Sequence, residues 1–317
     1  MNELAMMPSA VDASGYRLGQ PQRAGVLTMV PVFGPSYPGI APPRSGLKLS
    51  RVVTYGQVEL TNPAGSGVAI VPLHVGYIQD SAQNHALCRS AFVAAGQTLR
   101  FDDACCVQET QGGYLAGRDQ WFFVLPVELR ADALRMRGEA RYNKLWDAIA
   151  GFNGRYGLPA RGHLEQVLTR KRAGLTQYQS RFELLEGQIG ALFFVGSRLA
   201  GVEIAPDPVY FAEVWMALVC FAYGPAAWFA TGDAAGPAEP FTVDSLDGLR
   251  AALTGQRRSV ADEVQEWLSR APWRPGELVE EERYLNLRLS TVSGEAVGGQ
   301  IVSDGDRLVY ASLFTTL

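Results

Sequence analysis

The feature that most constrains the fold is a change of hydrophobic period near residue 128. From Gly25 to about Val127 the sequence consists of short β-branched and aromatic runs, such as "VLTMVPVFG" and "WFFVLPVEL", separated by Gly, Pro, Asn and Asp. Runs of this length and spacing are typical of strands in a sandwich or a related antiparallel sheet. We therefore expect a flexible N-terminus over residues 1–16 and a β-rich, sandwich-like half over residues 17–127.

The second region, residues 128–187, is helical in composition and is expected to connect the two halves. Apolar side chains at Leu175, Tyr178 and Phe182 recur at three- and four-residue steps, which is the period of one helix face. Gly187 follows soon afterwards and is expected to end this helix.

The third region, residues 188–317, is expected to form an α+β module. It opens with two apolar runs around Gly196-Ser197, a pair that favours a two-residue hairpin turn. Asp207-Pro208 resembles an N-cap followed by a proline at the first helical position, which predicts an apolar helix from about residue 208 to 223. The uncharged stretch around it is as long as the shortest membrane spans. Because Gly224-Pro225 interrupts the stretch, we expect a core helix and no membrane span.

The rest of this region predicts two short helices and three strands. The helices are expected from Asp244 to Gly255 and from Ser259 to a stop at Pro272. Strands follow at "RYLNLRLST", "AVGGQIVSD" and "RLVYASLFT". Together with the hairpin they predict an antiparallel sheet of about five strands with helices on one face. We expect this module and the β-rich half to pack as one compact unit.

Composition and charge exclude several classes of protein. With 28 Lys and Arg against 32 Asp and Glu, the formal charge is −4, which argues against nucleic-acid binding. The first residues lack the basic and apolar segments of a secretory signal, so a cytoplasmic location is expected. Adjacent Cys105 and Cys106 point to opposite faces of a strand and suit neither a shared metal nor a disulfide with each other. Cys88 and Cys220 are expected to be inert core side chains.

Most motifs that carry catalysis are absent from the sequence. There is no P-loop, no glycine-rich dinucleotide motif after a strand, no G-x-S-x-G elbow, no H-E-x-x-H and no C-x-x-C. Of the three histidines, His74 lies in an apolar run and is expected in the core, His163 is expected to be exposed, and His85 has polar neighbours. We therefore expect no metal site and no cofactor.

The densest polar stretch is "QDSAQNH", residues 79–85, between two strand-like runs. Asp80 is the candidate general base and His85 the candidate proton shuttle. The other polar side chains are candidates to bind amide or hydroxyl groups of a ligand. These ligand-binding candidates are Gln79, Ser81, Gln83 and Asn84. The alternative is a turn in which the same side chains bind their own backbone.

Glu109 joins the catalytic candidates through an expected pairing of strands. If residues 87–94 and 98–107 form a hairpin about Ala95-Gly96, the outer ends of both strands lie at one edge of the sheet. Glu109 then returns close to His85.

Four segments resemble, in the same order, a known family. They are "LGQPQRAGVLTMVPVFG", "AQNHALCRSAFVAAGQTLRF" followed by "CCVQE", "GQIGALFFVGSRLAGVEIAPDPVYFAEVWMALV", and "GEAVGGQIVSDGDRLVYASLF". The family is the ARG and rhodanese-phosphatase-superfamily-associated protein domain family, where ARG stands for ADP-ribosylglycohydrolase, and the similarity spans residues 17–315. Its most specific parts are Gln83-Asn84, the Gly196 hairpin and the Asp207-Pro208 helix start. The resemblance implies a place in ADP-ribose or NAD-derived metabolism or signalling.

The polar stretch departs from the family's usual motif, which resembles "GEELVGAKQNR" where this chain has "GYIQDSAQNH". Gln83 and Asn84 match that motif, and the run ending at Glu109 resembles the family's "CVEQ". His85 stands at the family's Arg position. Asp80 is a candidate substitute for the charge that is lost.

Two functions of different classes follow. The first is a binding or interaction domain associated with ADP-ribose or NAD-related metabolism or stress signalling, with a small molecule of that kind as its ligand. An apolar surplus around Trp215, Trp228 and Phe229 favours self-association, so a homo-oligomer is expected. The alternative is an enzyme that acts on an ADP-ribose or NAD-derived small molecule at the edge formed by Gln79–His85 and Glu109.

Overall fold

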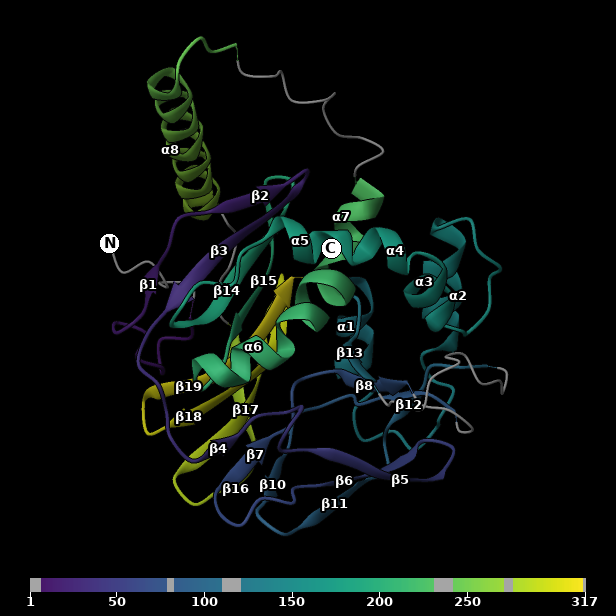
Figure 1. Ribbon diagram of the computed structural model, residues 1–317. Helices are drawn as coiled ribbons and strands as arrows, with labels where there is room; N and C mark the ends of the chain where they lie inside the picture. Colours follow the sequence, from purple (N-terminus) through teal and green to yellow (C-terminus); the bar gives the residue numbers. More distant parts are fainter. Residues whose placement is uncertain (1–6, 79–82, 110–120, 231–241, 271–275, 316–317) are drawn as a thin grey trace.

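The computed structural model describes residues 7–78, 83–109, 121–230, 242–270 and 276–315. One large antiparallel sheet forms the centre of the described protein, the small sheets of the N-terminal half lie at one end of it, and helices pack on its faces (Figure 1). The mixed α+β architecture expected from the change of period is confirmed.

The large sheet has nine strands and draws on both ends of the chain. Their order is β1-β3-β14-β15-β19-β18-β17-β16, and β2 also pairs with β3. The strands are β1 (Arg17–Leu18), β2 (Gln22–Ala24), β3 (Leu27–Phe33), β14 (Gln188–Val195), β15 (Arg198–Ile204), β16 (Glu277–Tyr284), β17 (Leu287–Ser293), β18 (Val297–Asp304) and β19 (Arg307–Thr315). The expected hairpin at Gly196 is confirmed, with Val195 opposite Arg198.

Two differences make this sheet larger than the five strands expected. Strand β3 pairs antiparallel with β14, which joins the N-terminal half to the C-terminal sheet. The run "RYLNLRLST", expected as one strand, contains a turn in which Leu285 has a positive φ of 52°, and it divides between β16 and β17. The alternating pattern of a strand continues through that turn, so the pattern alone concealed it.

The N-terminal half forms three small sheets, ordered β10-β7-β4, β11-β6-β5 and β12-β9-β8-β13. Their strands are β4 (Ile40–Ala41), β5 (Lys48–Thr54), β6 (Gln57–Thr61), β7 (Val68–Ile70), β8 (Val75–Ile78), β9 (His85–Ala86), β10 (Phe92–Ala94), β11 (Thr98–Phe101), β12 (Cys105–Cys106) and β13 (Trp121–Val124). The expected hairpin about Ala95-Gly96 is wrong in its pairing: β10 pairs with β7, and β11 pairs with β6.

Short helices form the connector. They are α1 (Val127–Arg135), α2 (Trp146–Arg155), α3 (Glu165–Arg170), α4 (Arg172–Leu175) and α5 (Gln177–Arg181). The helix expected to run to Gly187 ends at Arg181, and Phe182 is extended. The Gln22 side chain explains the early end, because it both accepts from the backbone N–H of Glu183 and donates to its carbonyl. These bonds pair the backbone N–H and carbonyl of Glu183, which would otherwise pair within a continuing helix.

The apolar helix begins as expected, with the Asp207 carboxylate accepting a hydrogen bond from the N–H of Tyr210 at 2.9 Å. It comprises α6 (Pro208–Met216), the π-helical turn η1 (Ala217–Tyr223) and α7 (Gly224–Ala230). It therefore continues past Gly224-Pro225 instead of ending at Tyr223. Pro225 lies in the first turn of α7, where proline is tolerated.

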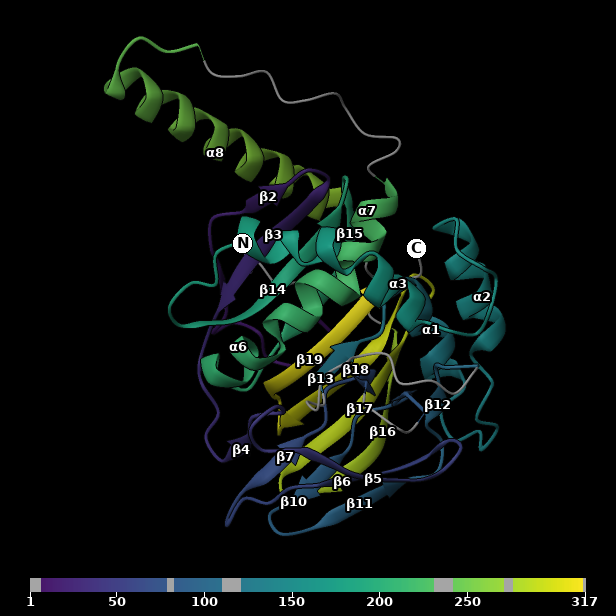
Figure 2. The ribbon, with the colours of Figure 1, turned by 45° about the vertical axis from the view of Figure 1, so that its right-hand side comes forward.

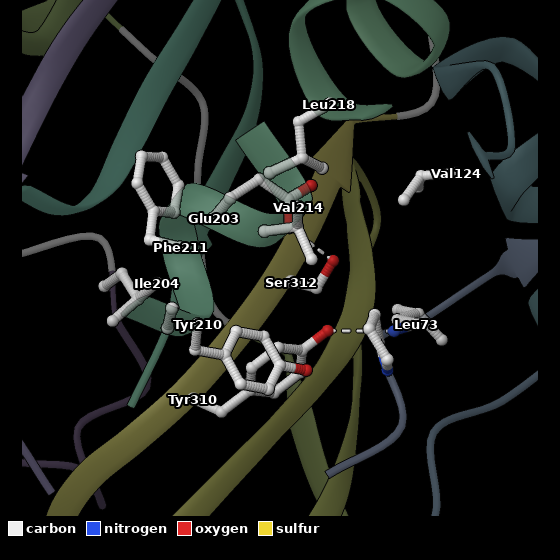
Figure 3. Close-up of a pocket in the computed structure, with 12 residues that line it drawn as sticks. Leu73, Val124, Glu203, Ile204, Tyr210, Phe211, Val214, Leu218, Tyr310 and Ser312 are labelled. Carbon is white, nitrogen blue, oxygen red and sulfur yellow. Dashed lines mark hydrogen bonds between the residues drawn. The ribbon is translucent and has the colours of Figure 1, made fainter. Parts of the chain in front are cut away.

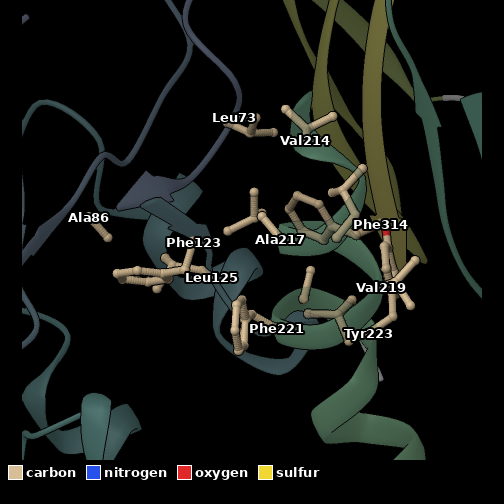
Figure 4. Packing of buried hydrophobic residues seen from close by; sticks show 14 of the residues in the cluster. Leu73, Ala86, Phe123, Leu125, Val214, Ala217, Val219, Phe221, Tyr223 and Phe314 are labelled. Carbon is tan, nitrogen blue, oxygen red and sulfur yellow. The ribbon is translucent and has the colours of Figure 1, made fainter. Parts of the chain in front are cut away.

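This helix lies inside the protein. Of the described helices, it alone is long and apolar enough to cross a membrane, yet most of it is buried. Figure 4 shows Phe221 and Tyr223 of η1 packed among Phe123, Leu125 and Phe314. Packing of this kind is typical of a core helix.

The helix α8 (Leu246–Arg270) differs from the sequence expectation in two ways. It is one helix of 25 residues instead of two, because a glycine in a helix costs only about 1 kcal/mol and Gly255 does not break it. It also lies on the opposite face of the large sheet from α6, where Trp267 packs on Phe194 of β14 with 5.5 Å between ring centroids. Its first half extends away from the sheet (Figure 2).

Candidate functional site

The structure describes part of the predicted polar edge, which comprises residues 79–85 and Glu109. Gln79, Asp80 and Ser81 lie outside the described residues. The remaining candidates do come together: Cys106 of β12 pairs with His85 of β9, and the N–H of Val107 donates to the carbonyl of Asn84 at 2.9 Å. The expected return of the strand leading to Glu109 is thus correct, although it uses a different pairing.

His85 is held at both ring nitrogens. Its Nε2 accepts from the backbone N–H of Gly56 at 3.0 Å, and Nδ1 lies 2.8 Å from the carbonyl of Gln83, which places the proton on Nδ1. Burial lowers the pKa of His85 to about 4, against a smaller opposing effect of the Gln83 carbonyl. The ring is therefore neutral at pH 7, and neither nitrogen is left for a substrate.

The other described members of the edge bond to one another. The Gln83 side-chain oxygen accepts from the Cys106 thiol at 3.2 Å, and the Gln108 side-chain oxygen accepts from the N–H of Asn84 at 3.0 Å. The Glu109 carboxylate accepts from the N–H of Gly162 at 2.9 Å. These contacts tie the β9–β12 pair to the connector, a structural role that two uncharged amides suit well.

His163 is also part of this edge, contrary to the expectation that it is exposed. It is 4% exposed and forms an isolated bridge with Gln108. Its position next to Gly162, which bonds to Glu109, explains its burial.

A buried ionic centre, which the sequence pattern does not predict, lies between the connector and the large sheet. Arg130 of α1 is 0% exposed and Glu203 of β15 is 5% exposed, and Nη1 lies 2.6 Å from Oε1. The hydroxyls of Tyr223 and Ser312 also donate to the Glu203 carboxylate, each at 2.6 Å. In the sequence, the one indication of this centre is Glu203, the single acidic residue in the apolar strand "RLAGVEI".

His74 completes this centre from the N-terminal half. Its Nδ1 accepts from Nε of Arg130 at 3.1 Å, and its φ of 61° is in the left-handed region that few residues other than Gly adopt. Burial and the neighbouring Arg130 hold the pKa of His74 well below its ordinary value. A neutral His74 is required here, because Arg130 needs an acceptor at this position.

A small cavity borders the ionic centre (Figure 3). Glu203, Ser312 and Tyr310 line it from the sheet, and Tyr210 and Leu218 from the core helix. Its volume of about 20 Å³ is room for one water molecule and not for a metabolite. With three donors already on Glu203, we interpret this centre as a structural network.

A larger pocket opens on the surface between the β2–β3 turn, α4–α5 and α7. It measures about 390 Å³, within the range of small-molecule sites. The residues that line it are Ala24, Gly25, Gly174, Gln177, Tyr178, Arg181 and Trp228. Sequence analysis noted Trp228 only as exposed apolar surface, because the three segments that form the pocket are far apart in the chain.

The indole of Trp228 is fixed by a glycine. A Cβ atom added at Gly174 would lie 2.0 Å from the ring, so the indole rests directly on the Gly174 backbone. Trp228 remains 40% exposed. Arg181 and Gln177 are exposed beside it, and within the described residues Arg181 forms no ion pair. The pocket therefore combines the Trp228 indole, whose position is restricted by Gly174, with the Arg181 guanidinium, which forms no ion pair within the described residues.

The described residues contain no group of three His, Cys, Asp or Glu side chains placed to hold a metal ion.

Comparison of the chain with protein families gives a match over nearly its whole length. A family model described as the ARG and Rhodanese-Phosphatase-superfamily-associated Protein domain matches residues 15–314, nearly the whole chain. The chain belongs to this family. The resemblance inferred from the sequence is thereby confirmed, and the family's name gives a loose ADP-ribose-related context. Comparisons with curated proteins and with solved structures give no match.

Proposed function

We propose that the protein is a cytoplasmic binding domain for a small anionic nucleotide of the ADP-ribose or NAD-related class, and that the ligand occupies the pocket at Trp228. The observation that supports it is the 390 Å³ pocket itself, because the cavity at the ionic centre is too small for such a molecule.

The chemistry of the lining residues suits this ligand. Aromatic faces such as that of Trp228 stack on nucleobases, worth about 1–3 kcal/mol per base. The guanidinium of Arg181 presents a planar set of donors that matches phosphate oxygens. Gln177 offers an amide for a ribose hydroxyl or a phosphate. Base, sugar and phosphate therefore each have a partner among residues that line one pocket.

The pocket is also preorganised. The backbone of Gly174 contacts the Trp228 ring and restricts its position. The two hydrogen bonds between Gln22 and Glu183 hold β2 against the end of α5. A site that is formed before the ligand arrives loses less conformational entropy on binding.

Calorimetric titration tests the proposal. ADP-ribose, ADP, NAD and ribose 5-phosphate would be titrated into the wild-type protein and into Trp228→Leu and Arg181→Gln. We expect binding of ADP-ribose or ADP, and a fall in affinity of about tenfold or more in each variant. Arg141→Gln is the matched control, since Arg141 is a 67% exposed side chain of the connector outside the pocket.

Two outcomes would contradict the proposal. Absence of heat with all four ligands at millimolar protein and ligand would exclude this ligand class. Binding that survives Trp228→Leu and Arg181→Gln together would place the ligand elsewhere on the protein.

Self-association is a second proposed property, and it is supported by α8. Leu246, Leu249 and Leu253 recur at helical spacing on the part of α8 that extends from the sheet, and Leu246 is 74% exposed. A second copy of the chain is the partner we propose for this stripe. Light scattering of wild type and of a Leu246→Gln, Leu253→Gln double variant tests it, and a monomeric wild type at high concentration contradicts it.

A further inference from the structure

Two buried cysteines lie in contact near the polar edge. The sulfur atoms of Cys88 and Cys105 are 2.9 Å apart, and both residues are buried, at 1% and 0% exposure. Cys105 pairs with Ala86 across the β9–β12 ladder, and Cys88 lies in the bend two positions after Ala86. This bend brings the Cys88 side chain against that of Cys105.

The surroundings make the two sulfurs unequal. The hydrogen bond from Cys105 lowers the pKa of the Cys88 thiol, the ammonium of Lys144 lowers it further, and burial opposes both effects. The pKa of the Cys105 thiol is raised by the same contact and by burial. Lys144 is held in place by donating to the carbonyl of Asp103 at 2.8 Å. Cys88 is thus the more acidic of the two thiols, and its thiolate is the nucleophilic form.

We propose that Cys88 and Cys105 form an oxidisable dithiol, a modification site that a peroxide converts to a reversible disulfide. The Cys88 thiolate attacks one oxygen of hydrogen peroxide, so that an S–O bond forms, the O–O bond breaks and hydroxide leaves. Cys105 then loses its proton, and its sulfur attacks the sulfur of Cys88. The S–S bond forms as the S–O bond breaks and a second hydroxide leaves. The two thiol protons convert both hydroxides to water, and the two electrons lost by sulfur reduce the peroxide.

Because both sulfurs are buried, a small oxidant reaches them only when the structure opens locally. Strands β9 and β12 contain two residues each, so local opening here breaks a short ladder. The disulfide then ties β12 covalently to the bend that follows β9, next to the bonds of Gln83 and His85 described above. It closes a loop between positions 17 apart in sequence.

The other two cysteines are in different surroundings. The Cys106 thiol donates to the Gln83 side-chain oxygen at 3.2 Å, and burial in the core helix raises the pKa of Cys220 to about 11. Oxidation is therefore expected to be selective for one pair.

The test is oxidation of the reduced protein with a few equivalents of hydrogen peroxide near pH 7.5. The intact mass should fall by about 2 Da, as expected for loss of two hydrogens, and dithiothreitol should restore it. Closing this loop should raise the melting temperature by about 5 °C. Cys88→Ala and Cys105→Ala should each lose the 2 Da change.

The matched control is Cys106→Ala. Cys105 and Cys106 share one tryptic peptide, residues 101–118, so digestion alone does not separate them. The control variant should keep the link between Cys88 and this peptide. If Cys88→Ala fails to fold, differential alkylation of the wild-type protein identifies which thiols disappear.

The proposal is overturned if the wild-type mass does not fall, if the link joins Cys106 or Cys220, or if it forms only in denaturant. None of these results depends on nucleotide binding at Trp228.

Discussion

Arg130 and Glu203 form a buried ion pair that joins three parts of the chain. Arg130 is on the connector helix α1, Glu203 is on β15 of the large sheet, and Arg130 also donates to His74 of the N-terminal half. Because every charge in this network has a partner, its members stabilise one arrangement of the three parts.

Removing one partner of this pair should be strongly destabilising. Glu203→Leu leaves the Arg130 guanidinium buried without its carboxylate, and we expect the free energy of unfolding to fall by about 3–5 kcal/mol. Urea unfolding followed by circular dichroism measures it. The double variant Arg130→Met, Glu203→Leu should lose less than the sum of the two single variants. Additive losses would show that the pair does not act as a unit.

Gly174→Ala should weaken ligand binding at the Trp228 pocket with little change in stability. The new Cβ would lie 2.0 Å from the indole, so the ring must move, and loss of stacking should lower affinity about tenfold. Gly151→Ala in α2 is the control, because its Cβ would meet nothing within 4 Å. Equal affinities in both variants would mean that the indole position does not matter.

The stability contributed by His85 should depend on pH. Its pKa of about 4 in the folded protein is below the unfolded value of about 6.5. Below pH 6.5 the unfolded chain binds a proton at His85 more readily than the folded protein does. The free energy of unfolding is therefore at its full value above pH 6.5 and decreases as the pH falls to about 4. Between pH 7 and pH 4 the wild type should therefore lose about 3 kcal/mol more than His85→Gln. Parallel pH profiles of the two proteins would contradict this assignment.

Gly76→Ala should destabilise the β8–β13 pair. A Cβ at Gly76 would lie 2.4 Å from the ring of Phe123, which is fully buried. Overpacking of this kind costs about 1–3 kcal/mol. Thermal unfolding compared with Gly65→Ala, whose Cβ would meet nothing within 4 Å, measures the effect.

The parts of the fold that sequence patterns predicted are those determined by neighbouring residues. Gly196 has the positive φ that its hairpin turn requires, and the Asp207 carboxylate caps its helix, as expected from two adjacent residues in each case. The polar edge was also found in part, since the strand leading to Glu109 does return to Asn84 and His85.

The parts that sequence patterns missed depend on contacts between distant residues. Nothing local to Glu203 indicates that Arg130 is its partner, and nothing local to Trp228 indicates that Gly174 will lie beneath its ring. The end of α5 is similar, because it is determined by the side chain of Gln22. For α8 the difference is local: a glycine such as Gly255 ends a helix only weakly, and no proline follows it within the helix.

The pairing of β3 with β14 has a consequence for how the chain is made. The partner of Met29 in this pairing lies in a segment that begins at Gln188, 159 positions later. At about 5–20 residues per second of synthesis, β3 waits roughly 8–30 s before β14 exists. During that interval its apolar edge is open on the ribosome. A nascent-chain chaperone that shields β3 would therefore affect the yield of native protein without altering the stability of the finished molecule.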